Sequence, residues 1–384
     1  MATTIGIPKE IKNHEYRVSV TPAGVAALVE LGHSVIVQAD AGEKIGYQNV
    51  DYANAGAKIT DNVKEVFTCP MVVKVKEPQP SEIRNFYQGQ VLFTYLHLAP
   101  DPEQTKKLLE KKVVGIAYET ITDIKGQLPL LIPMSEVAGR LSITAGALSL
   151  QMASGGNGKL LGGVPGVQPA KVVVLGGGVV GTEAAKMALG LGADVTIMDI
   201  NLTRLRYLSD VLPNIKTLHA NKIAITEQVT TADLVIGAVL LPGDKAPKLI
   251  SREMVAQMKH GSVLVDVAID QGGCSETSHA TTHSEPTYII DGVVHYCVAN
   301  MPGAVARTST EALTNATLPY IINLANKGYQ QAFEDDPGFA KGLNVINGEI
   351  TNQSVAESVG LPYRAYVECV GRLQGRGHLN SVIG

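Results

Sequence analysis

The sequence predicts an α/β fold made of two Rossmann-like domains, one of which is inserted into the other. Short apolar runs alternate with helical stretches along most of the chain, which is typical of parallel sheets with crossover helices. A glycine-rich loop joins an apolar run to a helix near the middle. A long helical pattern returns after Met301 and is expected to complete the N-terminal domain. The 384 residues suffice for two domains of about 100–200 residues each.

The first domain is predicted to begin with residues 1–130. The apolar run TIGIP indicates a short strand, and a polar loop that carries Arg17 follows it. Thr21 and Pro22 are typical of the N-cap and first position of a helix, here over residues 23–31. This part contains no glycine-rich phosphate loop. Its further strands are expected at residues 34–38, 71–76, 91–98 and 113–118.

The second domain is predicted to span residues 131–303. A helix over residues 135–154 and a Gly/Pro-rich segment lead into an apolar run at 172–175. The runs LVIGAVL (234–240) and VLVDVAID (263–270) have the composition of buried parallel strands. Residues 304–384 are predicted to return to the first domain. An active site would then lie in the cleft between the two domains.

The run at 172–175 leads directly into Gly176-x-Gly178-x-x-Gly181. In a dinucleotide-binding loop, Gly176 would allow the tight turn, Gly178 the approach of a pyrophosphate and Gly181 close packing of helix on strand. The following helix would offer its N–H groups and the positive end of its dipole to the phosphates. Such glycines also occur in ordinary turns. The flanking strand, helix, second strand and terminal acid favour dinucleotide binding.

Asp199 ends the second apolar run, where an acid would accept hydrogen bonds from the adenosine ribose. A carboxylate pairs with a ribose 2′-hydroxyl and repels a 2′-phosphate, so NAD is favoured over NADP. Arg204 and Arg206 follow closely and could hold a phosphate. While Asp199 occupies the ribose position, we expect them to be solvated helix residues instead.

Composition excludes several classes of function. The net charge of −4 provides no basic field for nucleic acid or an anionic membrane. The N-terminus lacks the apolar core of a signal peptide, and no apolar run approaches the roughly 18–20 residues that span a bilayer. The four cysteines are widely separated, with no CxxC and no metal spacing. We therefore expect reduced thiols, a cytoplasmic location and no metal site.

Four polar residues occupy positions that are unusual for a purely structural role. His97 lies near the end of the apolar run VLFTYLHL, although a histidine there is often a satisfied core residue. Asp270 closes VLVDVAID, at the carboxyl end of a strand, where open α/β sheets bind ligands; acids also cap loops at such places. Arg17 lies in a loop and Lys76 at a strand end, and each alone could be a solvated cation.

These residues lie within a series of longer motifs, among them GIPKEIKNHEYRVSVTPAGV, KVKEP, LFTYLHLA, PMSEVAGRLS, LGGGVVGTEAAKMA, VDVAIDQGGC and YCVANMPGAV. Together they resemble the L-alanine dehydrogenase family, which is related to the N-terminal part of transhydrogenases. The resemblance extends from the N-terminus to about residue 345. Residues 350–384 resemble the family poorly, and the ending RLQGRGHLNSVIG matches neither a core pattern nor a motif.

The resemblance implies reversible, NAD-dependent oxidative deamination of L-alanine to pyruvate and ammonia. His97 would be the acid/base and Asp270 its partner across the cleft. Arg17 and Lys76 would hold the substrate, because a guanidinium fork matches a carboxylate and an ammonium is a point donor. Oxidation would leave an iminium that water converts to a carbinolamine, and a histidine suits the proton transfers near neutral pH. The family resemblance also implies a homohexamer.

Further positions follow from the resemblance alone. Met134 and Asn300 would line the substrate side. At Ala220 the family can have a serine, so only a backbone contact is expected there. Small molecules are the expected partners, without nucleic acid or membrane. The implied cofactor contacts are Ser135, Gly176, Gly178, Val180, Gly181, Asp199, Arg204, Ala220, Val239, Leu240, Val267 and Met301.

Two other functions compete with an alanine dehydrogenase. The first is the soluble nucleotide-binding component of a proton-translocating transhydrogenase, which would not oxidise an amino acid. Such a component should show membrane helices or a docking segment, and none is visible in the sequence. The second is a non-catalytic NAD-binding protein. The combination of Arg17, Lys76, His97 and Asp270 argues against both, because neither function needs an amino-acid site.

Overall fold

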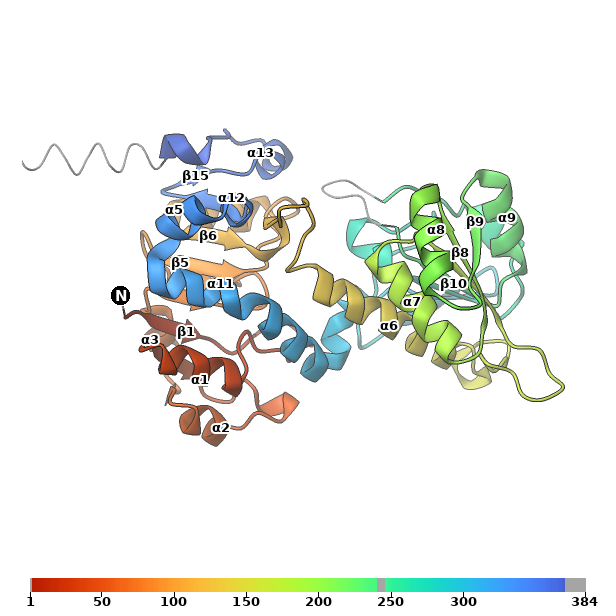
Figure 1. The fold of residues 1–384 in the computed structure, drawn as a ribbon, viewed down its shortest axis with the longest axis horizontal. Helices are drawn as coiled ribbons and strands as arrows, with labels where there is room; N and C mark the ends of the chain where they lie inside the picture. The colour runs from red at the N-terminus through yellow and green to blue at the C-terminus, as the bar shows by residue number, and fades with distance from the viewer. Residues whose placement is uncertain (1, 240–245, 370–384) are drawn as a thin grey trace, which may run out of the picture. The chain divides into compact units, whose positions relative to one another are not determined.

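The structure is a computed structural model that describes residues 2–239 and 246–369. The described chain divides into two compact units. Unit 1 comprises the residues up to Pro133 and those from Ala306 onward, and unit 2 comprises Met134–Val305. Each unit contains a sheet flanked by helices (Figure 1), so the predicted α/β fold class is confirmed. No helix in these residues is long and apolar enough to cross a membrane.

The sheet of unit 1 has the strand order β15-β14-β6-β5-β4-β1-β2-β3. Strands β1 to β6 are all parallel, in the order 3-2-1-4-5-6 of a doubly wound sheet, whereas β14 pairs antiparallel with β6 and β15 pairs antiparallel with β14. The strands are β1 (Thr4–Ile7), β2 (Ser34–Gln38), β3 (Lys58–Thr60), β4 (Met71–Val73), β5 (Val91–Thr94), β6 (Val114–Ala117), β14 (Leu343–Ile346) and β15 (Glu349–Ile350).

Helices cover both faces of this sheet. Helix α1 begins as the sequence predicts, with the Thr21 hydroxyl accepting from the Gly24 N–H and Pro22 in the first turn. The long α11 crosses one face beside α1 (Figure 1) and is interrupted at Gly328, whose φ is 72°. The helices are α1 (Pro22–Glu30), α2 (Asn49–Asn54), α3 (Val63–Phe67), α4 (Pro80–Ile83), α5 (Pro102–Lys111), α11 (Ala306–Asp335), α12 (Pro337–Ala340) and α13 (Gln353–Val359).

Two predicted strands of unit 1 were too long. The strands expected over 71–76 and 91–98 end at Val73 and Thr94, because side chains from neighbouring loops capture the backbone that follows them. The described part of the poorly assigned C-terminal stretch packs onto unit 1, where α13 contributes Val355 and Ala356 to the core. The ending 372–384 lies outside the described residues.

Unit 2 has a seven-stranded sheet in the order β12-β13-β11-β10-β7-β8-β9. All its strands are parallel except β12, and β7, β8, β9, β10, β11 and β13 again follow the order 3-2-1-4-5-6. The strands are β7 (Lys171–Leu175), β8 (Asp194–Asp199), β9 (Lys216–His219), β10 (Leu234–Gly237), β11 (Val263–Asp266), β12 (Thr287–Ile290) and β13 (Val293–Tyr296).

Apolar side chains fill the space on both faces of the unit 2 sheet, because alternate residues of its buried strands point to opposite sides. Val172 and Val174 belong to one core cluster, and Val173 and Leu175 belong to the other. The strands expected over 234–240 and 263–270 end at Gly237 and Asp266. The helices are α6 (Ile132–Ser149), α7 (Val179–Gly190), α8 (Leu202–Val211), α9 (Lys222–Thr231) and α10 (Arg252–Ala256).

Within unit 2, α6 packs closely on the first turn of α7. Gly139 of α6 is buried, and a Cβ atom added there would lie 2.3 Å from the carbonyl oxygen of Val180. Gly190 at the end of α7 is exposed and has no atom within 4 Å of such a Cβ. The two glycines are therefore a matched pair, since both are helical and only one is sterically required.

We predict that Gly139→Ala lowers the free energy of unfolding by about 1–3 kcal/mol, because the methyl group must displace backbone. Gly190→Ala should leave stability unchanged or raise it by up to about 1 kcal/mol, since alanine is the better helix former. Urea unfolding followed by circular dichroism measures both. Equal midpoints for the two variants would contradict the packing described for Gly139.

Candidate active site

The parallel strands of unit 1 all present their carboxyl ends at one edge of the sheet, which is where open α/β sheets bind ligands. Glu10 follows β1, and Lys74 and Lys76 follow β4. His97 follows β5 and Glu119 follows β6. Since β1 and β4 are adjacent and their crossover helices diverge there, this edge is also the topological switch point of unit 1.

Lys74 is fully buried between two glutamates at this edge. Its Nζ donates to Oε2 of Glu10 at 3.1 Å and to Oε1 of Glu82 at 2.8 Å. Burial opposes the charged ammonium, yet the two carboxylates outweigh it and raise the pKa of Lys74. Lys74 is therefore a structural cation that ties the loop after β1 to the end of β4 and to α4. This role was not predicted from the sequence.

Lys76 is half-buried and lies beyond the end of β4. The other oxygen of Glu10 accepts from the N–H of Val75 at 2.7 Å and from the N–H of Lys76 at 3.3 Å. The Lys76 carbonyl accepts from the Thr94 hydroxyl at 3.0 Å. The backbone at Lys76 is thus held by side chains that follow β1 and end β5.

Arg17 is buried, with its side chain 2% exposed, and is paired with Glu15. Arg17 Nε donates to Glu15 Oε1 at 2.7 Å and Nη2 donates to Oε2 at 2.6 Å, a bidentate arrangement. Burial opposes the charge, but the hydrogen bonds and charge of Glu15 raise the pKa of Arg17. Arg17 therefore remains a cation, oriented by the carboxylate beside it.

The loop that carries Arg17 is anchored from two directions. The Val18 N–H donates to the hydroxyl of Thr310 on α11 at 3.2 Å. The Ser19 hydroxyl donates to the carbonyl of Val73, at the end of β4, at 2.8 Å. The segment that returns after unit 2 thus helps to position a predicted site residue.

His97 is exposed and has a left-handed backbone conformation, with φ of 46°. Its N–H donates to Oε1 of Glu119 at 2.7 Å. Its ring stacks on Tyr95, with centroids 5.8 Å apart and planes at 12°. Tyr95 is buried and donates its hydroxyl to the carbonyl of Leu130 at 2.5 Å.

Two ionisable side chains, Tyr95 and Glu77, lie near the predicted site residues of unit 1. Burial raises the pKa of Tyr95, and the charge of Arg17 opposes that rise. Tyr95 therefore interacts with the charge of Arg17 and also stacks on the ring of His97. The charges of Lys76 and His97 both act on the carboxylate of Glu77. Burial opposes its charge, but Lys12, Lys76 and His97 outweigh burial and lower the pKa of Glu77.

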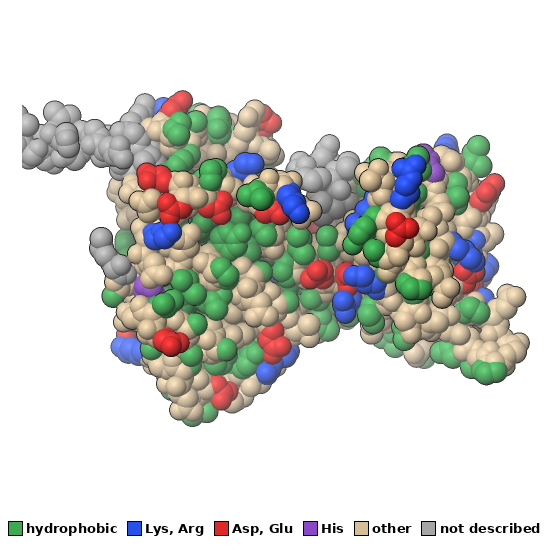
Figure 2. Space-filling view, in the orientation of Figure 1, with side chains coloured by type: hydrophobic (Ala, Val, Ile, Leu, Met, Phe, Trp, Pro, Cys, Tyr) green, Lys and Arg blue, Asp and Glu red, His purple; other side chains and the backbone are tan. Residues whose placement is uncertain are grey.

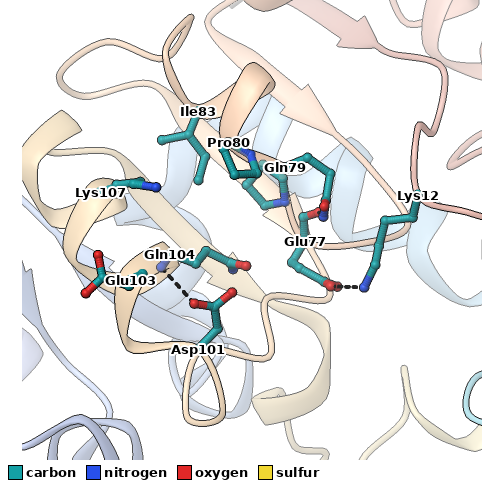
Figure 3. A pocket seen from close by; sticks show the side chains of 10 residues that line it. Lys12, Glu77, Gln79, Pro80, Ile83, Asp101, Glu103, Gln104 and Lys107 are labelled. Carbon is teal, nitrogen blue, oxygen red and sulfur yellow. Dashed lines mark hydrogen bonds and ion pairs between the residues drawn. The ribbon is translucent and has the colours of Figure 1, made fainter.

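A pocket of about 200 Å³ lies beside this edge, between the loop after β4 and the start of α5 (Figure 3). Glu77 and Lys12 face one another and are ion-paired there, and Asp101 caps α5 by accepting from the Gln104 N–H. None of Arg17, Lys76 and His97 lines this pocket, so we do not assign the pocket to the reaction.

In unit 2 the glycine loop connects β7 to α7, as predicted. Gly176 has φ of 103°, and a Cβ there would lie 2.6 Å from the carbonyl oxygen of Ala238. A Cβ on Gly181 would lie 1.8 Å from the carbonyl oxygen of Gly176. Gly178 is the N-cap residue of α7 and has open space where a Cβ would be. The helix N-terminus is therefore accessible to a phosphate.

Asp199 ends β8 and contacts this loop directly. Its Oδ2 accepts from the Gly177 N–H at 2.7 Å, and its Oδ1 accepts from the Asn201 N–H at 2.8 Å. Each carboxylate oxygen has a further lone pair, so Asp199 retains acceptor capacity for ribose hydroxyls. Arg204 Nε donates to the Gly177 carbonyl at 2.6 Å, and its Nη2 donates to the Thr182 hydroxyl at 2.7 Å. Arg204 thus braces the loop from α8.

Several other predicted cofactor residues follow strands at the same edge. The Ala220 N–H, after β9, donates to the carbonyl of Asp199 at 3.0 Å. Val239 follows β10, and Val267 begins the turn after β11. Val180 lies in the first turn of α7. Leu240 lies outside the described residues.

The remaining predicted residues of unit 2 lie on α6 and on the segments after β11 and β13. Met134 is buried and Ser135 half-buried on α6. Asn300 has φ of 63°, and its carbonyl accepts from His283 Nε2 at 3.1 Å. Met301 is buried at the start of a short 3₁₀ helix.

Asp270 is exposed in the 3₁₀ turn that follows β11, Val267–Gln271. It contrasts with Asp266, the last residue of β11, which is fully buried. Asp266 accepts from the Cys274 N–H at 2.8 Å and from the Ser278 hydroxyl at 2.5 Å. Asp266 therefore fixes the loop that follows, whereas Asp270 is an acid of this segment that is exposed to solvent.

The carboxylates that hold the candidate site residues of unit 1 were not predicted from the sequence. Glu10 and Glu15 lie in the same motif as Arg17, GIPKEIKNHEYRV, and Lys74 alternates with Lys76 in KVKEP. This clustering of opposite charges around an apolar strand end was the available signal, because charged residues are rarely buried unless they are paired. Glu119 had no comparable signal.

Known proteins resemble the chain over nearly its whole length. Residues 6–138 match the alanine dehydrogenase/PNT N-terminal domain, and residues 142–353 match the alanine dehydrogenase/PNT C-terminal domain. An alanine dehydrogenase of Halomonas elongata is 58% identical over 369 residues, which are 96% of this chain and 100% of that protein. One of Methanococcus maripaludis is 58% identical over 94% of this chain and 97% of its own.

Solved structures give a consistent result. An L-alanine dehydrogenase structure superposes with a TM-score of 0.91 at 52% identity, covering 93% of this chain and 99% of that one. A transhydrogenase from Sinorhizobium meliloti superposes with a TM-score of 0.79 at 24% identity, covering 91% and 99%, a likeness of fold alone. As the sequence motifs predicted, the chain belongs to the alanine dehydrogenase/PNT family.

Proposed function

We propose that this protein catalyses the reversible, NAD-dependent oxidative deamination of L-alanine to pyruvate and ammonia. The observation that carries the proposal is the carboxyl edge of unit 1, where glutamates fix the guanidinium of Arg17 and the backbone of Lys76 and of the exposed His97. The relatives that are 58% identical support the same enzyme class, because they are alanine dehydrogenases themselves.

Membership of a dehydrogenase family implies a nicotinamide cofactor, and the residues of unit 2 fit a dinucleotide. Gly176 and Gly181 are positions where any side chain would strike backbone, which is what a tight phosphate loop requires. The open N-terminus of α7 suits a pyrophosphate. We propose NAD rather than NADP because Asp199 would repel a 2′-phosphate. Arg204 supports this choice, since two of its N–H groups already brace the loop.

The remaining cofactor contacts that we propose lie after the strands of unit 2 or on neighbouring helices. Ala220 has no side-chain polar group, and its N–H is occupied by Asp199, so only its carbonyl could bind the cofactor. The other proposed contacts are Ser135, Val180, Val239, Val267 and Met301.

In unit 1, we propose that Arg17 and Lys76 hold the carboxylate and the developing carbonyl oxygen of the substrate. Arg17 donates two of its N–H groups to Glu15, which fixes the plane of a guanidinium fork whose geometry matches a carboxylate. A fixed fork aligns the substrate before the reaction, and such alignment lowers the activation barrier. Met134 and Asn300 of unit 2 are the other proposed substrate residues.

The bound cofactor would accept the hydride from the Cα of alanine. The protein then has to move protons. We propose that His97 takes the proton from water as the water attacks the iminium carbon. His97 then returns this proton to the amine, and it accepts the hydroxyl proton as the C–N bond breaks and the carbinolamine collapses to pyruvate and ammonia. A ring that is exposed while its backbone is fixed suits repeated proton exchange with substrate and solvent. Asp270 is the proposed acidic partner of His97.

A cytoplasmic location and a homohexamer are also proposed. Cys69, Cys274 and Cys297 are buried thiols, which is typical of a reducing compartment. Hydrophobic side chains gather on the face of unit 1 where α11 lies (Figure 2). On α11, Leu318 and Ile322 are one helical turn apart and remain only half-buried in the single chain, as expected for a surface that another copy covers.

The first prediction concerns the substrate cation. The protein should form NADH from L-alanine and NAD⁺, and Lys76→Gln should lower kcat/KM by about 10–100-fold, since a hydrogen bond to a charged group contributes about 1.5–3 kcal/mol. Lys106→Gln, which removes an exposed lysine of α5, is the control and should retain activity. The kcat/KM values of the parent and both variants are measured from the steady-state rate of NADH absorbance change. Absence of NADH formation, with no reverse reaction from pyruvate and ammonia, would refute the proposed function.

The second prediction concerns cofactor choice. Asp199→Asn keeps one oxygen that can accept from the Gly177 N–H but removes the negative charge. The KM for NADP⁺ should fall and the KM for NAD⁺ should rise, because repulsion of the 2′-phosphate and one ribose hydrogen bond are lost. Asp210→Asn, an exposed acid of α8, is the matched control. If the ratio of the two KM values does not change, Asp199 does not select the cofactor.

The third prediction concerns assembly. Sedimentation velocity at micromolar protein concentration should give a single six-chain species. Replacing half-buried Leu318 and Ile322 by lysine should shift it towards smaller species, because charges would be buried in the interface. A parental protein that sediments as a monomer or dimer would contradict the hexamer.

A further inference from the structure

We propose that Glu119 is a positioning residue for the reaction, which holds the backbone of His97 so that its imidazole is presented to the substrate. This proposal rests on the proposed function of His97 as the acid/base. Glu119 lies in the short turn Tyr118–Thr120 that follows β6, beside the end of β5 from which His97 extends.

The contacts of Glu119 are to the backbone that carries His97. Its Oε1 accepts from the His97 N–H at 2.7 Å and from the Leu96 N–H at 3.1 Å. Its Oε2 lies 3.2 Å from the same Leu96 nitrogen. One carboxylate thus accepts hydrogen bonds from two consecutive backbone N–H groups. The strength of these bonds depends on the negative charge of Glu119 and on the length of its side chain.

These contacts counteract a local conformational cost. His97 has φ of 46°, and residues with a Cβ rarely adopt this left-handed conformation. Strand pairing cannot maintain it, because β5 ends at Thr94. In the absence of the carboxylate, the chain would relax towards the extended conformation, which would redirect the His97 side chain.

Other contacts hold the same segment. Gln104 donates to the carbonyl of Leu96 at 2.8 Å, so the N–H and the carbonyl of Leu96 are both engaged. The buried ring of Tyr95 stacks on His97. The direction of the imidazole therefore depends on a small set of contacts, among which the carboxylate of Glu119 is the acceptor for the His97 backbone N–H. Loss of this contact should therefore change the orientation of the His97 imidazole and not only the stability of the fold.

The test compares Glu119→Ala, Glu119→Asp and a control, Glu110→Gln, at an exposed glutamate of α5. We expect kcat for L-alanine to fall about 100-fold in Glu119→Ala, since a misplacement of about 1 Å can cost this much. The shorter Glu119→Asp cannot reach both N–H groups and should lose about tenfold. The Kd for NADH should stay within about twofold in every variant, because the proposed cofactor residues lie in unit 2. Glu110→Gln should match the parent.

A double-mutant cycle with His97→Ala separates the two roles. If Glu119 acts through His97, Glu119→Ala should not lower the residual activity of His97→Ala further. An equal further loss in that background would overturn the proposal, and so would a folded Glu119→Ala variant with parental kcat. If Glu119→Ala does not fold, Glu119→Asp decides, and parental kcat in that variant would overturn the proposal.

Amide hydrogen exchange provides a readout that does not depend on the reaction. Peptides containing Leu96 and His97 should exchange faster in Glu119→Asp than in the parent, whereas peptides from unit 2 should not change. Unchanged exchange at Leu96 and His97 would overturn the positioning role. Absence of L-alanine oxidation by the parent would instead refute the proposed function, so the two failures are distinguishable.

Discussion

The unit 1 site depends on a fully buried cation, Lys74, held between Glu10 and Glu82. Two carboxylates and one ammonium without solvent are stable only as a set, because removing one partner leaves an uncompensated buried charge. The same Glu10 also receives the backbone N–H groups of Val75 and Lys76. The ion pairs that bury Lys74 thus also fix the loop after β4. The backbone of Lys76, the proposed substrate lysine, is held by the same Glu10.

The two units share a strand order but have different residues at the carboxyl edges of their sheets. At the carboxyl edge of unit 2, glycines allow close backbone approach and leave the helix N-terminus open, which suits the proposed phosphates, and Asp199 supplies one charge. At the corresponding edge of unit 1, paired charges fill the space, and glutamates hold Arg17, Lys76 and His97 in place. A doubly wound sheet therefore supplies the location, whereas the loop residues determine which ligand fits.

Local features were predictable from the sequence, and long-range pairing was not. The glycine loop and Asp199 were recognised because turn, helix start and strand end lie close together in the sequence. The runs around Lys76 and His97 look like longer strands in the sequence. The residues that end these strands, Glu10 and Glu119, come from the segments that follow neighbouring strands. Family resemblance supplied the residues that are proposed to react. It did not supply the carboxylates behind them, because their contacts depend on the folded chain.

We propose that the carboxyl edge of unit 1 recognises the substrate through the carboxylate of the substrate. A crystal structure of the protein with pyruvate and NADH would show whether this is so. We expect the carboxylate oxygens of pyruvate to lie about 3 Å from nitrogen atoms of Arg17 or Lys76, with His97 in contact with the reacting carbonyl group. Pyruvate bound away from these three side chains, in a complex that is competent for turnover, would show that this edge is not the substrate site.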